Sequence, residues 1–339
     1  MNLSVSFTQS RGWFRSNLLG IVLCVVIGLA AVAIAGRIGG ATFLYALLLG
    51  ALLHPLQQSP LVGQGVDFCA RQVLRVGVAL LGARITFSQV SELGWTQVII
   101  LVLAIATTIA FGIGLAMWLG MPRWKGLLSG GATAICGASA ALALAAALPR
   151  GPEKERFTLV VVVAVTALST VAMVSYPIIV QFLQLSTSQA GLFLGGAIHD
   201  VAQVVAAGFM ISDETGERAT IVKLLRVASL AVVVACVAAV YRGESSPDGK
   251  KAPLLPWFMV VFIALATFNS LNWIGPSIKL AADESSRAML VVAISALGAK
   301  SSFGGLVSAG WRAALLIVGE TVWIAVFILG CIWWLHLYH

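Results

Sequence analysis

Eleven apolar runs follow one another along this chain, with short polar breaks between them. They cover residues 17–35, 41–55, 67–90, 95–120, 126–148, 157–184, 189–210, 219–241, 255–274, 285–308 and 312–337. About 20 apolar residues are enough for an α-helix to cross the hydrocarbon core of a bilayer. A membrane β-barrel would instead show short strands of alternating polarity. The sequence therefore predicts an all-α polytopic membrane protein with about 10–11 transmembrane helices.

The composition supports this prediction. Charged residues make up only 10% of the chain and apolar residues 60%, whereas a soluble domain has about 25% charged residues. We therefore expect a lipid bilayer as the solvent and a single integral membrane domain over residues 1–339. The net charge of +8 comes from basic residues at the ends of the runs, where they meet lipid headgroups. Arg11, Arg15 and the loop 242–251 favour a cytoplasmic N-terminus.

Several classes of function are not expected. The five cysteines are scattered singly, so they indicate neither a disulfide framework nor a zinc site. The chain has no phosphate-binding loop and no hydrolase motif, and no basic face with interleaved aromatic residues. We therefore expect no cofactor, no metal, no nucleic acid partner and no enzymatic activity.

An internal repeat is the strongest sign of organisation. Residues 73–95 (VLRVGVALLGARITFSQVSELGW) and 289–311 (MLVVAISALGAKSSFGGLVSAGW) share the frame V-x4-L-G-A-(R/K)-x2-F-x6-G-W. At a constant offset of 216 residues, Phe87 falls on Phe303. We expect repeat copies around 41–120 and 255–337, separated by an odd number of spans and therefore antiparallel. Inverted-topology repeats of this kind are typical of secondary transporters, which bind their substrate near the membrane midplane.

Two stretches between the repeat copies, 126–148 and 189–210, are rich in glycine and alanine. Gly130, Gly131 and Gly137 in the first stretch, and Gly195 and Gly196 in the second, would allow each helix to break. The N-terminus of a half-helix attracts an anion. On this hypothesis the substrate-binding residues are Gly130, Gly131, Thr133, Cys136, Ser139, Gly195, Gly196 and Gln203. The alternative is that the small residues only let helices pack closely.

His199 and Asp200 lie inside the second of these stretches. An ionisable side chain at mid-membrane costs at least about 2.5–3.5 kcal/mol, so it normally faces a cavity or a partner. We predict that these two residues carry the coupling proton or ion; the alternative is a structural hydrogen-bond network. In a continuous helix His199 and Gln203 share a face, and Asp200 points about 100° away.

Other charged residues fall near or inside apolar runs. Arg84 and Lys300 occupy matching positions of the repeat, and we predict that they help to attract an anion; snorkelling to the interface is the alternative. Glu320 lies within the last run and is expected to need a cationic partner, in a structural ion pair or a coupling site. Residues 213–218, with Asp213, Glu214, Glu217 and Arg218, are predicted to form a solvated loop.

Several motifs resemble those of one family of bacterial inner-membrane proteins. They are LYALLLGALLHP (44–55), VGVALLGARITF (76–87), SGGATAICGASAA (129–141), GGAIHDVAQVVAAG (195–208) and ETGERATIVKLLRV (214–227). The chain is similar in these motifs to the YeiH-like family, whose members are classed as sulfate exporters. The resemblance runs from about residue 17 to residue 335. It implies a secondary transporter in the bacterial inner membrane, distantly similar to bile-acid and sodium/proton antiporter-type carriers.

These observations lead to one function and two alternatives. We expect a proton- or ion-coupled secondary transporter of a small anion, with sulfate or a sulfonate as the lead substrate, working by alternating access. The alternatives are an anion channel and a membrane protein that does not transport, such as a receptor or an assembly factor. Apolar faces with small residues are compatible with a homo-oligomer.

Overall fold

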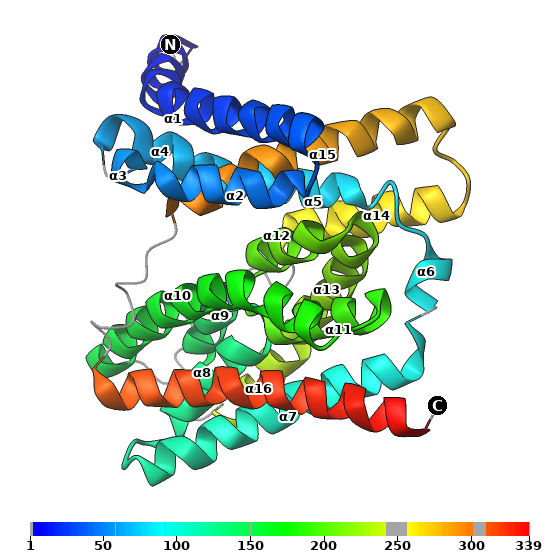
Figure 1. Ribbon diagram of the computed structural model, residues 1–339. Coiled ribbons are helices and arrows are strands. Elements are labelled where there is room, and N and C mark those ends of the chain that lie inside the picture. The colour runs from blue at the N-terminus through cyan, green and yellow to red at the C-terminus, as the bar shows by residue number, and fades with distance from the viewer. Residues whose placement is uncertain are drawn as a thin grey trace. The chain divides into compact units, whose positions relative to one another are not determined.

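The computed structural model describes residues 3–57, 59–91, 93–148, 151–241, 256–300 and 310–338, and every regular element within these ranges is a helix (Figure 1). Contacts divide the chain into two compact units. The first unit comprises Met1–Ser88 and Phe258–Ser301, and the second Gln89–Trp257 and Ser302–His339. Phe303 of the repeat and the loop 242–251 lie outside the described residues.

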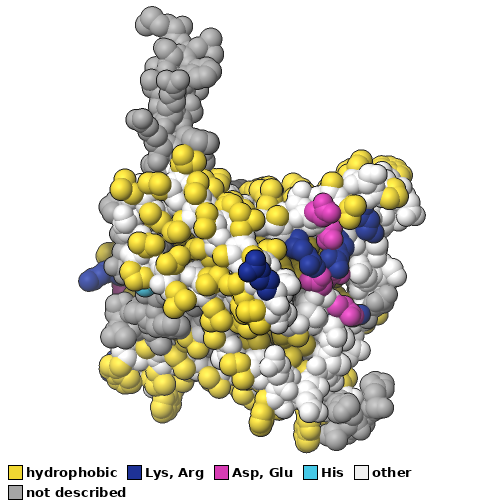
Figure 2. Space-filling model, turned by 45° about the horizontal axis from the view of Figure 1, so that its top comes forward, with side chains coloured by type: hydrophobic (Ala, Val, Ile, Leu, Met, Phe, Trp, Pro, Cys, Tyr) yellow, Lys and Arg dark blue, Asp and Glu magenta, His cyan; other side chains and the backbone are white. Residues whose placement is uncertain are grey.

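Among the described residues, five helices are long and apolar enough to cross a membrane. They are α1 (Leu3–Ile38, apolar from Asn17), α7 (Gly94–Trp118), α10 (Pro152–Phe182), α13 (Asp213–Val240) and α16 (Trp311–Tyr338). Large apolar side chains are exposed, with Trp95 83% and Phe182 85% accessible. Figure 2 shows a face covered largely by apolar side chains, with most of the charged ones gathered in one region. The predicted all-α polytopic membrane fold is confirmed.

The first unit contains α1 and two sets of helices from opposite ends of the sequence. The early set is α2 (Thr42–Leu52), α3 (His54–Gln57), α4 (Pro60–Phe68), the π-turn η1 (Cys69–Val73) and α5 (Leu74–Leu81). The late set is α14 (Trp257–Ser270) and α15 (Pro276–Lys300). Helical backbone angles at Phe68 and Leu74 make α4, η1 and α5 one continuous helical segment. This segment and α15 both begin at a proline, and the two prolines are 216 residues apart.

Two ion pairs in the first unit correspond to each other through the repeat. Lys300 Nζ lies 2.6 Å from Asp67 Oδ1, and Arg84 Nη1 lies 3.0 Å from Asp283 Oδ1. Both the two cations and the two carboxylates are separated by the repeat offset of 216 residues. The start of each segment is therefore paired with the end of the other, so the segment α4–η1–α5 and α15 pack antiparallel.

Close helix contacts in the first unit follow the same correspondence. Gly82 lies against the backbone carbonyl of Phe262 in α14, and Gly298 lies against the carbonyl of Leu47 in α2. A Cβ atom at either glycine would overlap that carbonyl. Small residues are the usual means by which membrane helices approach closely. The two copies of the repeat therefore share their contacts as well as their sequence.

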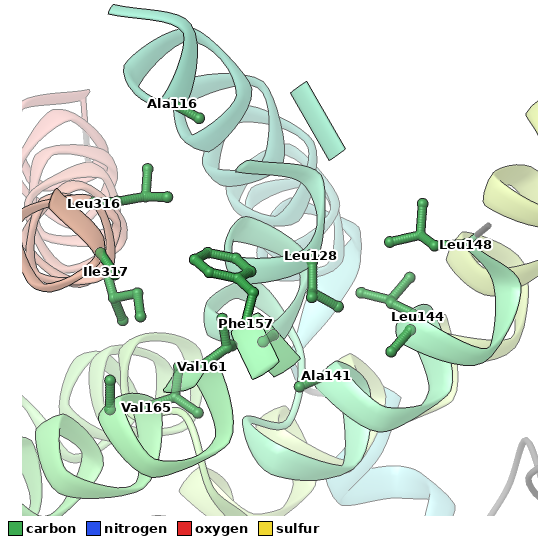
Figure 3. Close-up of a cluster of buried hydrophobic side chains, with 14 of the residues drawn as sticks. Ala116, Leu128, Ala141, Leu144, Leu148, Phe157, Val161, Val165, Leu316 and Ile317 are labelled. Atoms are coloured by element: carbon green, nitrogen blue, oxygen red, sulfur yellow. The ribbon is translucent and has the colours of Figure 1, made fainter. Parts of the chain in front are cut away.

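The short helix α6 (Phe87–Ser91) lies at the boundary of the two units in the sequence. The second unit holds the remaining helices. They are α7, α8 (Arg123–Ala134), α9 (Ala138–Ala147), α10, α11 (Thr187–Ala197), α12 (Val201–Ile211), α13 and α16. A buried apolar cluster joins α8, α9, α10 and α16; Figure 3 shows Leu128, Leu144, Phe157 and Ile317 in it. This cluster holds α8 and α9 in place on the two sides of the non-helical residues that separate them.

Candidate functional site

Two helices of the second unit are interrupted, and the interruptions meet. The first break, Ile135–Gly137, separates α8 from α9, and Gly137 has a positive φ of 66°. The second break, Ile198–Asp200, separates α11 from α12, and Ile198 is extended with ψ 138°. We call these two breaks, with the helix ends that flank them, the junction. The prediction that both stretches contain a broken helix agrees with this geometry.

Of the glycines expected to break the helices, Gly137 lies in the first break, whereas the other four do not form either break. Gly130 and Gly131 lie inside α8, and Gly195 and Gly196 lie inside α11. Their missing side chains serve packing: Gly130 lies against Ile109 and Thr108 of α7, Gly131 against Leu144 of α9, Gly195 against Ala219 and Val222 of α13, and Gly196 against Ile328 of α16. The half-helix N-termini therefore lie farther along the chain than expected, at Ala138 and Val201.

Two buried cations on α13 bind the C-terminal ends of both first half-helices. Lys223 Nζ donates to the carbonyls of Ile135 at 2.6 Å and Ile198 at 2.8 Å. The Arg226 guanidinium donates to Ala134 O at 2.8 Å through Nε, and to Gly195 O at 3.0 Å through Nη1. Lys223 is fully buried and Arg226 is 1% exposed.

These contacts set the electrostatics of the junction. The last carbonyls of a helix lack intrahelical partners and carry a partial negative charge. Two positive side chains satisfy the carbonyls at the ends of α8 and α11 and offset that charge. The opposite, positive ends belong to α9 and α12, which begin at the same junction.

Sequence reasoning missed Lys223 and Arg226, although a signal was present. Both interrupt the apolar run 219–241, and a cation within a membrane segment normally faces a partner. The predicted solvated loop just before this run is wrong, because Asp213–Val240 is one helix. Ser212 caps its N-terminus by accepting from the Thr215 N–H, and Glu217 is 6% exposed.

His199 is fully buried in the second break and connects three elements. Its Nδ1 lies 3.1 Å from Thr133 O in α8, and its Nε2 lies 3.0 Å from Thr321 Oγ1 in α16. A carbonyl only accepts, so Nδ1 carries a proton. The Thr321 hydroxyl also donates to Ile317 O of its own helix at 2.8 Å. His199 holds α8 and α16 against the break.

Gln203 and Asp200 have different partners from His199. Gln203 Oε1 accepts from Ser169 Oγ in α10 at 3.3 Å. The Asp200 N–H donates to the same Ser169 oxygen at 3.0 Å, and its carboxylate caps α12 by accepting from the Ala202 N–H at 3.2 Å. The expected common face of His199 and Gln203 is wrong, because the helix begins only after His199.

The junction is accessible at few positions. Within residues 128–141 only Ala138 and Ser139 are not buried, and within 190–210 only Asp200 is not. Thr133 and Cys136 are buried. Ala138 and Ser139 form the first turn of α9, whose N–H groups have no helical acceptor. The accessible surface therefore combines a hydroxyl, a helix N-terminus and the half-exposed carboxylate that caps α12.

The remaining predicted site residues lie elsewhere. Arg84 and Lys300 belong to the first unit, where each is held by a carboxylate, so their role toward an anion stays a prediction. Glu320 has hydroxyl partners, with Ser129 Oγ 2.6 Å from Oε1 and Thr133 Oγ1 3.2 Å from Oε2. No cation pairs with it among the described residues, contrary to expectation.

These features define a class: a polytopic helical membrane protein whose polar groups gather where two broken helices meet. Comparison with known proteins gives the family. A family model described as "Conserved hypothetical protein 698" matches residues 19–317. The chain belongs to this family of UPF0324 membrane proteins, and the expected YeiH-like resemblance is confirmed.

Three relatives illustrate the similarity. The UPF0324 membrane protein TauZ of Paracoccus pantotrophus is 44% identical over 94% of this chain and 96% of its own length. UPF0324 membrane protein RB0971 of Rhizobium meliloti is 43% identical over 98% and 99%. UPF0324 membrane protein CT0845 of Chlorobaculum tepidum is 40% identical over 93% and 89%.

Proposed function

We propose that this protein is a secondary transporter of a small anion in the bacterial inner membrane, with sulfate or a sulfonate as the lead substrate. The observation that carries the proposal is the charge arrangement of the junction. Lys223 and Arg226 occupy the negative ends of α8 and α11, so the positive end of α9 is left for a ligand. Broken helices with this polarity are a common way for transporters to bind anions.

The accessible groups support an anion at α9 rather than at α12. Asp200 already occupies the N-terminus of α12 through the Ala202 N–H. Ser139 lies in the first turn of α9 and is exposed. A sulfonate or sulfate oxygen there would accept hydrogen bonds from the Ser139 hydroxyl and from first-turn N–H groups, as anions do at other helix N-termini.

The mechanism that we propose is alternating access between inverted repeats. The antiparallel segments of the first unit and their corresponding ion pairs support it. Two equivalent arrangements of one set of contacts are what a carrier needs in order to open alternately to each side. In this proposal the coupling proton or ion is carried by a residue at or near the junction, with His199 and Asp200 as the residues predicted from the sequence.

The first experiment measures ligand binding to the purified protein, with the change in its thermal stability as the readout. A ligand that binds only the folded state raises the melting temperature by mass action. We expect a shift with sulfate, sulfite, thiosulfate, taurine or a small carboxylate, and none with chloride at equal ionic strength. Ser139→Ala is expected to weaken binding about tenfold, the loss of one hydrogen bond of about 1.4 kcal/mol.

The matched control is Ser175→Ala, because that hydroxyl bonds only to Val171 O of its own helix, at 2.9 Å. Counterflow of the bound anion in proteoliposomes then separates the alternatives. Saturable exchange supports a carrier, whereas conductance without exchange indicates a channel. The absence of a shift with every anion would contradict the proposal and favour a role without transport.

A further inference from the structure

Glu320 is fully buried in α16, and both of its carboxyl oxygens face α8. Its two partners are hydroxyls, and a carboxylate without a cationic partner is costly to bury. This carboxyl is not part of the accessible surface at Ser139 and Asp200. It therefore needs an explanation of its own.

The charged groups of the surrounding helices are engaged elsewhere. The described helices α7, α9 and α11 carry no charged residue, and α10 carries its charges only in the first turn, at 153–156. On α8, Lys125 pairs with Glu153 at 2.6 Å, and Arg123 Nε lies 3.2 Å from Met117 Sδ. On α16 itself, Arg312 lies two turns before Glu320. At the junction Lys223, Arg226 and Asp200 bind backbone groups, and His199 contacts Thr133 O and the Thr321 hydroxyl.

The hydroxyl geometry fits a protonated carboxyl. Ser129 Oγ lies 2.6 Å from Glu320 Oε1 and also 3.0 Å from the carbonyl oxygen of Lys125. A hydroxyl has one proton, and a carbonyl can only accept. If that proton goes to Lys125 O, the serine oxygen accepts a proton carried by Oε1. Thr133 then donates to the second oxygen, so all groups are satisfied at once.

The site leaves little room for a metal cation. Gly112 of α7 lies against Oε1 so closely that a Cβ atom there would overlap the carboxyl, and it would also lie 2.8 Å from Gly126 O. Sodium-sized ions take several oxygen ligands, whereas among the described residues only the hydroxyls of Ser129 and Thr133 bond to this carboxyl. A proton needs no such shell.

The carboxyl is connected to the junction through short links. Thr133, which contacts Oε2, presents its carbonyl to His199 Nδ1 at 3.1 Å and to Arg226 Nη2 at 3.0 Å. Thr321, the next residue after Glu320, contacts His199 Nε2 at 3.0 Å. A change in the protonation of Glu320 can therefore affect both breaks, through the contacts of α8 and α16 with His199 and Arg226.

We infer that Glu320 is the residue that carries the coupling proton, with Ser129 and Thr133 as the groups that hold it. This inference rests on the proposed transport function. When α8 and α16 separate, water enters and takes the proton from Oε1, which leaves a carboxylate that the two hydroxyls stabilise. Protonation from water on the other side restores the closed contact. The proton is the only species transferred, and no bond other than O–H forms or breaks.

Glu320→Gln tests the inference, because the amide is neutral and close in shape to the protonated acid. We expect anion binding and counterflow within about twofold of the wild type, but a loss of tenfold or more in uptake driven by a pH gradient. The pH dependence of exchange is expected to flatten. Glu217→Gln, a buried carboxyl of α13 in the same unit, is the matched control and should keep the wild-type pH profile.

An infrared measurement keeps the test independent of transport. A protonated buried carboxyl gives a C=O stretch above the amide I band, and this band should vanish in Glu320→Gln and persist in Glu217→Gln. An unchanged band, unchanged gradient-driven uptake, or uptake that depends on sodium instead of protons would each overturn the inference.

If Glu320→Gln does not fold, Glu320→Asp keeps a carboxyl and should shift the pH profile instead of flattening it. Failure of the wild type to bind or exchange any anion would refute the proposed function, while the infrared band would still decide the protonation of Glu320.

Discussion

At the scale of single residues, the ends of helices inside a membrane require donors that water cannot supply. Lys223 and Arg226 provide them for the carbonyls of Ala134, Ile135 and Ile198. A buried cation is itself costly, but these cations meet several oxygens that would otherwise be unsatisfied. The broken helices therefore depend on the cations of α13 as donors, and the buried cations depend on the free carbonyls as acceptors.

Lys223→Met should destabilise the protein. The change leaves the buried Ile135 O without this donor, while Ile198 O keeps its bond from Arg226 Nη1 at 3.1 Å. An unsatisfied buried carbonyl costs about 1–3 kcal/mol. Arg218→Met is the control, because that side chain is a quarter exposed and pairs with Glu214 at the surface. Thermal unfolding in detergent measures both, and equal melting temperatures for the two variants would contradict the role of Lys223.

Gly137→Ala and Gly114→Ala should have opposite effects. Gly137 has φ 66° and ψ −123° at the first break, a sparsely populated conformation that costs a residue other than glycine about 1–3 kcal/mol. Gly114 lies inside α7 with no heavy atom within 4 Å of an added Cβ, so alanine there should stabilise the helix by about 0.5–1 kcal/mol. Denaturation of the two variants side by side checks the signs. A neutral Gly137→Ala would mean that the break does not need its glycine.

At the scale of helices, the first unit is built from equivalent contacts made twice. The correspondence extends into the second unit, since α7 begins at Gly94 with φ 70° and α16 follows Gly310 with φ 76°. These two glycines are also separated by the repeat offset. α7 packs on α8, and α16 packs on α11, so each repeat helix meets a first half-helix.

Gly82→Ala and Gly298→Ala should destabilise the protein by similar amounts. Each Cβ would overlap a backbone carbonyl, of Phe262 and of Leu47 respectively, and overpacking of this kind costs about 1–3 kcal/mol. Gly36→Ala is the control, because no atom lies within 4 Å of its added Cβ. Melting temperatures compare the three variants. If only one of Gly82 and Gly298 is sensitive, the two contacts are not equivalent.

At the scale of the whole molecule, hydropathy and the repeat frame were enough to predict the all-α membrane fold. The repeat also pointed to Arg84 and Lys300 as a related pair. It could not give their partners, because Asp67 and Asp283 lie outside the quoted frame and pair across 233 and 199 residues of sequence. Glycine content predicted only part of the breaks: Gly137 lies in the first one, but the second, Ile198–Asp200, contains no glycine. Gly130 and Gly195 could not be assigned from the sequence, because they fit helix packing as well as helix breaking.

The buried acid on α16 has an electrical consequence. One carboxyl carries at most one proton per cycle, while sulfate has one more negative charge than a sulfonate. With the same proton count, the two anions therefore move net charges that differ by one elementary charge. A potential of 100 mV then changes their relative driving force by about 2.3 kcal/mol. Membrane voltage, in addition to the fit of the anion at α9, would decide which of the two accumulates on one side.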